Sequence, residues 1–368
     1  MGCFEIEELF QGRKVITEAT FCLPGKASGS FRSAISPGLS DAHAHPQVID
    51  VGEKGIWRDS YEWISRRKLR IREGDLRKDP ILSSKLASIA LKLSALDGVT
   101  LIALTGSIYG NYGNILAIRK ESLRPRTILL PTVMDREGWI SLEEARTIFG
   151  SHANLDGGTI KLGIFLHSLG FTRREAVKEA ILLSRKNNLP VALHLSEGKK
   201  EAFKLKEMLG ENAGGLIAVH CLEEPKECRE LGLKIVSCPL SNIYLYGRTL
   251  TSPDLFDALG SDWPLITGTM RDVLSISTSL FGFSEQLLGK ATLGGYELFS
   301  IPASNDISLY DESLIDVASG RARPKMVLVN GRETVVEGKL DGIDREEVEK
   351  EAREVIEEAF SLYGSDSS

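Results

Sequence analysis

The chain has 368 residues, which suits one large domain with additions or two domains. Its 42% hydrophobic and 26% charged residues are typical of a globular protein, and the net charge of -6 argues against a nucleic-acid-binding surface. It has no run of about eighteen apolar residues, so we expect no membrane-spanning helix. The acidic N-terminal residues lack a signal-peptide pattern, which predicts a cytoplasmic protein.

Short strands are predicted at both ends of the chain. They cover Lys14–Thr17, Ala19–Leu23, Lys325–Val329 and Glu333–Val336. Asn330-Gly331, between the last two, is typical of a two-residue hairpin turn. Neither pair of strands can form a core alone, so we predict one small composite β domain from residues 1–36 and 318–342.

Between these ends, apolar strand-like segments alternate with helical patterns. The strand candidates are Ile35–Asp41, Val99–Leu104, Thr127–Val133, Thr159–Leu166, Pro190–Leu195, Leu216–His220, Leu233–Ser237 and Pro264–Thr269. Eight strands alternating with helices predict an α/β fold, a (β/α)8 TIM barrel over residues 37–317.

Helices are predicted in most of the gaps, including Ile81–Leu96 and Arg173–Lys186. Thr172 is the expected N-cap of the second helix, with Glu175 completing a capping box. Residues 343–368 are predicted to form a final helix and a tail. Asp344 is the expected cap of that helix, and Glu347 completes its capping box.

The five cysteines show no Cys-x-x-Cys spacing. We therefore expect buried or partly buried free thiols and no metal site built on cysteine. The five are Cys3, Cys22, Cys221, Cys228 and Cys238.

Five of the six histidines lie at or just beyond the C-terminal end of a predicted barrel strand. They are His43, His45, His167, His194 and His220, whereas His152 lies in a loop-like segment and is expected at the surface. The C-terminal ends of the strands carry the active site in TIM barrels. His43 and His45 point to the same side of an extended segment and could form half of a metal site. Taken alone, such a pair is more often two ordinary surface or turn histidines.

Six segments occur in a recognisable order between residues 35 and 340. They are Pro37–His45, Leu189–Glu197, Ala218–Cys221, Cys238–Asn242, Ala291–Gly295 and Val327–Gly331. Together they resemble the amidohydrolase superfamily, in its deaminase and chlorohydrolase branch. The resemblance implies a mononuclear site for one divalent ion, zinc or iron, in a TIM barrel.

The resemblance also implies roles for individual residues. His43, His45 and His194 would be metal ligands, and His220 would orient the attacking water or the substrate. Glu197 would carry protons to the leaving group; alternatively, it occupies the first turn of a helix, where the helix dipole favours a negative charge. His167 would contact the substrate, or make a structural hydrogen bond instead.

One expected ligand is missing from this pattern. The family has an aspartate at the end of strand eight, and here Met270 follows the predicted strand Pro264–Thr269. A thioether is neutral and soft and cannot replace a carboxylate. Three alternatives remain: Asp272 takes the place of the aspartate, the histidines and Glu197 suffice, or the barrel has lost hydrolysis.

The sequence therefore predicts a metal-dependent hydrolase acting on non-peptide carbon–nitrogen bonds of a small heterocyclic compound. The alternative is a non-catalytic barrel that binds a small molecule or a partner protein. The segment Val48–Lys78, rich in aromatic residues and arginine, is either a lid over the substrate or a helix packed on the barrel rim. We expect a small-molecule substrate, no nucleic-acid or membrane partner, and a possible homodimer.

Overall fold

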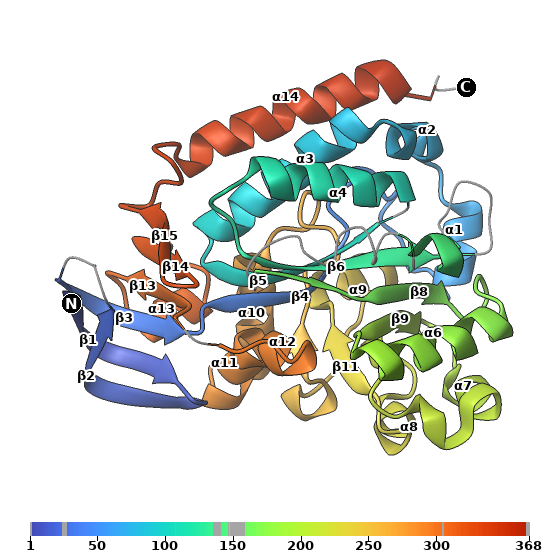
Figure 1. Ribbon diagram of the computed structural model, residues 1–368, viewed down its shortest axis with the longest axis horizontal. Helices are drawn as coiled ribbons and strands as arrows, with labels where there is room; N and C mark the ends of the chain where they lie inside the picture. Colours follow the sequence, from blue (N-terminus) through green and yellow to red (C-terminus); the bar gives the residue numbers. More distant parts are fainter. Residues whose placement is uncertain are drawn as a thin grey trace.

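The computed structural model describes residues 2–23, 28–106, 108–134, 141–145, 147, 159–303 and 305–365. The predictions for His152 and for the end of the tail, residues 366–368, lie outside these ranges. Figure 1 shows two bodies of strands: a barrel surrounded by helices and a smaller sheet beside it at the N-terminal end of the chain. Within the described ranges, no helix is both long and apolar enough to span a membrane.

The barrel consists of parallel strands in the order β12-β11-β10-β9-β8-β6-β5-β4, with β7 paired to β6. These strands are β4 (Leu39–Ala44), β5 (Val99–Gly106), β6 (Arg126–Val133), β7 (Ile160–Leu162), β8 (Ile164–Ser168), β9 (Val191–Leu195), β10 (Ile217–His220), β11 (Lys234–Ser237) and β12 (Ala258–Leu259). A parallel bridge between Ala44 and Asp262 connects the two ends of this sheet. The predicted TIM barrel is confirmed.

Most of the barrel strands are largely apolar, as expected for parallel strands that are buried on both faces. In β5, Leu101 and Ala103 belong to the cluster that fills the barrel, and the alternating residues Ile102 and Leu104 belong to the cluster shared with the helices. This two-residue alternation within one apolar run is what a parallel barrel requires.

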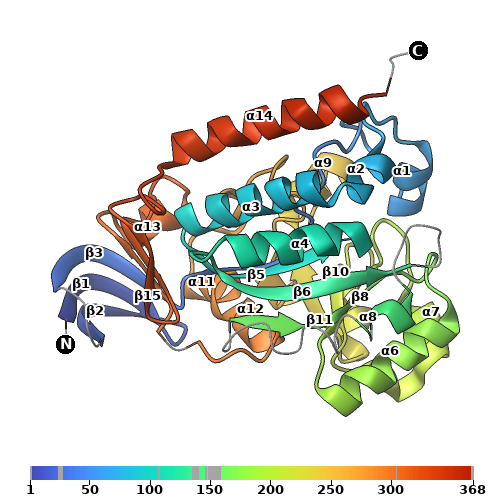
Figure 2. The same cartoon turned by 45° about the horizontal axis from the view of Figure 1, so that its top comes forward.

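Helices cover the outside of the barrel (Figure 2). They are α1 (Ser60–Arg66), α2 (Glu73–Lys78), α3 (Pro80–Leu96), α4 (Ile108–Lys120), α6 (Arg174–Asn187), α7 (Ala202–Leu209), α8 (Pro225–Glu230), α9 (Pro239–Tyr246), α10 (Met270–Phe281), α11 (Glu285–Ala291), α12 (Leu293–Leu298) and α13 (Leu314–Ala318). The prediction that Thr172 caps α6 is wrong. The N-cap is Arg173, and the Thr172 hydroxyl instead donates a hydrogen bond to the Val133 carbonyl at 3.4 Å.

The prediction for strand eight is also wrong. The eighth strand is β12, which pairs with β11 through Ala258 and Leu259. The predicted strand Pro264–Thr269 is instead a turn leading into α10, and Met270 is the first residue of that helix. A two-residue strand leaves no apolar run to detect, whereas Pro264-Leu265-Ile266 offers a misleading one.

The smaller sheet joins both ends of the chain, as predicted, in the order β15-β14-β13-β3-β1-β2. Its strands are β1 (Gly2–Gln11), β2 (Lys14–Leu23), β3 (Gly29–Ser36), β13 (Ile307–Tyr310), β14 (Met326–Val329) and β15 (Arg332–Val336). The hairpin at Asn330-Gly331 is confirmed. β13, which precedes residue 318, pairs with β3 and thereby connects the N-terminal strands to the C-terminal hairpin.

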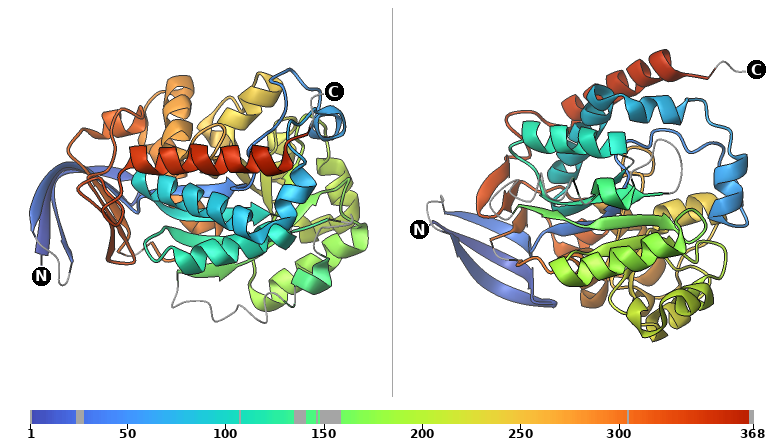
Figure 3. Two further views of the ribbon diagram at one scale, coloured as in Figure 1. Left: turned by 90° about the horizontal axis from the view of Figure 1, so that it is seen from above. Right: turned by 45° about the vertical axis from the view of Figure 1, so that its right-hand side comes forward.

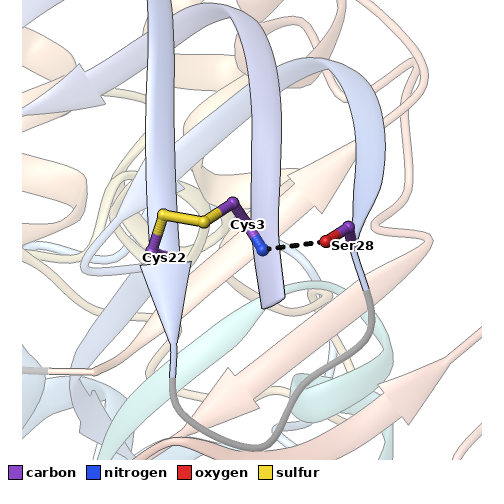
Figure 4. Close-up of a disulfide and its surroundings, with 3 residues drawn as sticks. All are labelled: Cys3, Cys22 and Ser28. Carbon is purple, nitrogen blue, oxygen red and sulfur yellow. Dashed lines mark hydrogen bonds between the residues drawn. A yellow bond between two sulfur atoms is a disulfide. The ribbon is translucent and has the colours of Figure 1, made fainter. Parts of the chain in front are cut away.

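Two of the cysteines are not free thiols, contrary to the prediction. Cys3 and Cys22 lie opposite each other in the antiparallel pair β1–β2 and form a disulfide (Figure 4). The remaining three, Cys221, Cys228 and Cys238, are buried free thiols as expected. Because structural disulfides are uncommon in cytosolic proteins, a cytoplasmic location remains a prediction.

The last helix, α14 (Arg345–Tyr363), lies along α3 on the outside of the barrel (Figure 3). Its predicted capping box is confirmed, because Asp344 accepts from the Glu347 backbone and Glu347 accepts from the Asp344 backbone. Lys92 of α3 pairs with Glu351 at 2.9 Å, so a polar contact adds to the apolar face between the two helices.

Candidate metal centre and active site

Four side chains from three strand ends converge at the C-terminal mouth of the barrel. His43 belongs to β4, His45 follows it, His194 belongs to β9, and Asp262 follows β12. Each offers one ligand atom, and these atoms all lie within 4.8 Å of one another. The Nε2 atoms of His43 and His194 are 3.2 Å apart. Asp262 Oδ1 is 3.5 Å from His43 Nε2 and 3.6 Å from His45 Nε2.

These separations fit a divalent metal ion. Zinc binds imidazole nitrogen at about 2.0–2.1 Å, so two nitrogens in a tetrahedral site lie about 3.3 Å apart. Three imidazoles and one carboxylate are ligands that both zinc and iron accept. The distances of 3.2–3.6 Å between the donor atoms therefore fit one ion held in common.

Burial favours the neutral form of the histidines, whereas the histidines around Asp262 favour its ionised form. Burial lowers the pKa of His43, and it lowers the pKa of His45 and His194 well below the usual value, so each has a nitrogen lone pair available at neutral pH. Burial acts to raise the pKa of Asp262, but the hydrogen bond from His43 and the nearby imidazoles outweigh it, and the net pKa is lowered. The donor set is thus in the protonation state that metal binding needs.

Neighbouring side chains orient two of the imidazoles. The Thr105 hydroxyl lies 2.8 Å from His45 Nδ1, and Asn242 Oδ1 lies 2.8 Å from His220 Nδ1. Because an amide oxygen only accepts, His220 donates its Nδ1 proton to Asn242, which directs Nε2 into the site. Such partners fix both the tautomer and the ring orientation.

Glu197 lies beside this cluster. Its Oε1 is 3.8 Å from His220 Nε2 and accepts a hydrogen bond from the Tyr246 hydroxyl at 2.8 Å. Burial and the negative charge of Asp262 raise the pKa of Glu197, although His220 and Tyr246 act in the opposite direction. A carboxyl group with a raised pKa is suited to holding and releasing a proton near neutral pH.

The backbone around the site departs from extended geometry. Ser196, His220 and Asp262 have φ values of 52°, 78° and 62°, a region that residues other than glycine seldom adopt. Hydrogen bonds between strands hold this arrangement: Asp262 N–H donates to the His43 carbonyl, and His45 N–H donates to the Asp262 carbonyl. Residues held in such conformations cluster at functional sites.

Gly260 follows β12 directly and lies close to His43 of β4. A Cβ atom at this position would lie 3.0 Å from both the Cβ and the carbonyl oxygen of His43. A side chain at this position, two residues before Asp262, would be tightly packed against a candidate ligand, and glycine avoids that contact.

These groups open into one cavity of about 340 Å3. Its walls include His167, Thr132 and Met134 from the barrel and Ser60, Trp63 and Arg67 from the α1 region. The segment Val48–Lys78, predicted as either a lid or a rim helix, thus forms part of the cavity wall through α1 and the residues that follow it. The size suits a small organic molecule.

Several solved structures resemble the chain over nearly its whole length. An adenosine deaminase from Xanthomonas campestris with bound zinc has a TM-score of 0.73 at 15% identity and covers 98% of both chains. Atrazine chlorohydrolase from Arthrobacter aurescens with zinc has a TM-score of 0.72 at 14% identity, over 97% of this chain and 100% of that one. Guanine deaminase from C. acetobutylicum with bound guanine has a TM-score of 0.69 at 17% identity, over 90% and 99%. The chain has the fold of these hydrolases. No family model and no curated protein sequence matches it.

Among the residues predicted for the site, the structure brings together His43, His45, His194, His220 and Glu197. His167 also lines the cavity, with its ring 5.4 Å from that of His194. The roles assigned to these residues remain predictions, and the structure provides their positions.

Asp272 does not belong to this group. It is the third residue of α10, where its carboxylate accepts a hydrogen bond from the Thr269 backbone in a capping box. Met270 is buried in the apolar cluster between barrel and helices. The carboxylate that faces the histidines belongs to Asp262, which the sequence analysis missed. The sequence Gly260-Ser261-Asp262 after a short apolar pair was the available signal.

Proposed function

We propose that the protein is a metal-dependent hydrolase that cleaves a non-peptide carbon–nitrogen bond in a small heterocyclic compound. One observation carries the proposal: three imidazoles and the Asp262 carboxylate converge within 4.8 Å, beside the protonatable Glu197. We propose His43, His45, His194 and Asp262 as the ligands of one zinc or iron ion. A non-catalytic barrel would be favoured by a missing carboxylate, and Asp262 provides a carboxylate just after β12.

A bound divalent ion would lower the pKa of a coordinated water towards about 7 and polarise the bond to be hydrolysed. Side chains of the protein then transfer the protons and orient the reactants. Glu197 takes a proton at Oε1, where Tyr246 holds the carboxylate in place, and returns it to the departing nitrogen. His220, fixed by Asn242, presents Nε2 to the attacking water or to the substrate.

The size of the cavity and the names of the structural neighbours support a proposed substrate class. A space of about 340 Å3 admits a ring system with small substituents and excludes a folded polypeptide. Guanine deaminase and atrazine chlorohydrolase, which share the fold, act on flat nitrogen heterocycles as their names state. We propose amino-substituted heterocycles, deaminated with release of ammonia, as the first compounds to test, with His167 contacting the ring.

Two measurements test the proposal in sequence. Elemental analysis of protein purified without chelators should find roughly one zinc or iron per chain. A screen of aminopurines, aminopyrimidines and aminotriazines for ammonia release should then find turnover that zinc restores to the metal-free protein. Protein that holds less than about a tenth of an equivalent, even after supplementation with zinc or iron, would contradict the proposal.

A further inference from the structure

Two buried thiols lie in contact next to His220. Cys221 directly follows this histidine at the end of β10, and Cys228 is the fourth residue of α8. Their Sγ atoms are 2.9 Å apart, with Cys221 donating a weak S–H hydrogen bond to Cys228. Heavy atoms that are not bonded pack at about 3.5–4.0 Å. The two sulfurs are closer than this, and a movement of about 0.9 Å, from 2.9 Å to about 2.05 Å, would bring them to disulfide bonding distance.

Cys228 is the residue through which α8 packs against the barrel. The helix has six residues, and Cys228 is its only buried one. Both thiols belong to the apolar cluster that lies between the barrel and its helices. One small side chain buries little apolar area, and a helix this short has little stability of its own. A covalent bond from Cys228 to the end of β10 would therefore stabilise the attachment of α8.

The native fold already holds the two segments together. The Cys221 N–H donates to the carbonyl of Leu195, the last residue of β9, at 3.0 Å. Glu224, the N-cap residue of α8, accepts a hydrogen bond from the Ser196 hydroxyl at 2.8 Å. Both ends of the connection between β10 and α8 are thus anchored to the end of β9. A disulfide would join segments that are already in place, so it would fit the fold without rearrangement.

We propose that Cys221 and Cys228 are an oxidation site at which a second disulfide forms, linking α8 covalently to the end of β10. Hydrogen peroxide is a suitable oxidant. It converts one thiol to a sulfenic acid and releases one water, and attack by the other thiol then forms the S–S bond and releases a second water. The two thiols together lose two protons and two electrons. Conditions that maintain the Cys3–Cys22 disulfide would also favour this one.

The buried setting makes the pair slow to react. Burial raises the pKa of the Cys221 thiol well above its usual value, and the contact with Cys228 acts in the same direction. Because the thiolate is the reactive form, oxidation of the closed fold is slow, and local opening of α8 is the step that admits the oxidant. A buried disulfide is equally protected from reduction. The bond is therefore a lasting structural link and not a rapid switch.

Peptide mapping tests the proposal on the full wild-type chain. Trypsin cleaves after lysine and arginine, which places Cys221 in peptide 207–226 and Cys228 in peptide 227–229. The protein is treated with hydrogen peroxide over hours, unfolded in an alkylating reagent that blocks free thiols, and digested without reduction. Most of Cys221 should then occur in a linked pair of these two peptides, lighter by two hydrogen atoms than their sum.

Two variants distinguish this pair from the third buried thiol. Cys228→Ser removes one partner and should abolish the linked peptides. Cys238→Ser makes the same change at the remaining free thiol and should leave them unchanged. Oxidation should also raise the thermal midpoint of the wild type and of Cys238→Ser by a few degrees, with no rise in Cys228→Ser. The wild-type peptide map involves no substitution, so it remains informative even if a variant fails to fold.

Four outcomes would overturn the proposal. They are Cys221 and Cys228 recovered as alkylated free thiols after the treatment, sulfinic or sulfonic acid at either residue in place of the link, a link from either residue to Cys238, and a linked pair whose thermal midpoint is no higher than that of the untreated protein. The last result would show that the bond strains the native geometry. None of these measurements involves metal binding or turnover, so they are independent of the proposed function.

Discussion

Replacing Asp262 with asparagine should remove most of the metal affinity. The Asp262→Asn change keeps the shape of the side chain but removes the only negative charge among the four candidate ligands. Even at the dielectric constant of water, a unit charge about 2.1 Å from a divalent ion contributes about 4 kcal/mol. An amide oxygen retains part of this attraction through its dipole. If about half is lost, zinc affinity falls by about 2 kcal/mol, or roughly thirty-fold.

Competition with a chromogenic zinc chelator measures this loss, with circular dichroism to show that the variant is folded. Asp272→Asn is the matched control, because it makes the same chemical change at the carboxylate that the sequence offered as one possible replacement for the missing aspartate. Asp272 caps α10, so the control should lower the free energy of unfolding by no more than about 1 kcal/mol and leave zinc affinity unchanged. Normal zinc binding by Asp262→Asn, or its loss in Asp272→Asn, would refute the assignment of the fourth ligand.

Three further predictions concern catalysis, the close approach at the ligands, and the small sheet. Glu197→Gln should lower kcat by about 10²–10⁴-fold at unchanged metal content. Steady-state kinetics and zinc analysis measure this, and a variant that turns over at the wild-type rate would contradict the proton-transfer role of Glu197. Gly260→Ala should reduce both thermal stability and zinc occupancy, because the new Cβ would lie 3.0 Å from atoms of His43. A thermal melt and metal analysis test this. Values equal to those of the wild type would show that β4 can shift to accommodate the methyl group. Replacing Cys3 and Cys22 with serine should lower the free energy of unfolding by about 3 kcal/mol, since the disulfide joins residues 19 apart. Denaturant unfolding of the oxidised wild type and the variant measures this loss. Equal unfolding midpoints would contradict the prediction.

The sequence was sufficient to predict the helices and strands whose pattern of apolar residues reflects which of their faces are buried. Seven barrel strands were predicted at or near their observed positions, because apolar runs buried on both faces are distinct from the amphipathic helices between them. The capping box at Asp344 was predictable because it depends only on residues three apart. The same pattern failed at Thr172, whose hydroxyl has a partner in β6 that no local rule can reveal.

The three candidate histidine ligands could be predicted from local sequence patterns. His43, His45 and His194 each belong to or directly follow a recognisable strand, so their shared position at the mouth of the barrel followed from the strand order. The Cys3–Cys22 disulfide could not be predicted in this way, because the pairing depends on the register between β1 and β2.

Asp262 was missed because its position depends on how the barrel closes. Its strand, β12, has two residues, and the backbone of Asp262 itself makes the contact with β4: its N–H donates to the His43 carbonyl and its carbonyl accepts from His45 N–H. The residue that supplies the negative charge to the candidate metal centre thus also connects the first and last strands. The backbone contact that closes the barrel therefore also sets the position of the Asp262 carboxylate. A search for local apolar runs cannot detect it, because the pairing partner lies more than 200 residues away in the sequence.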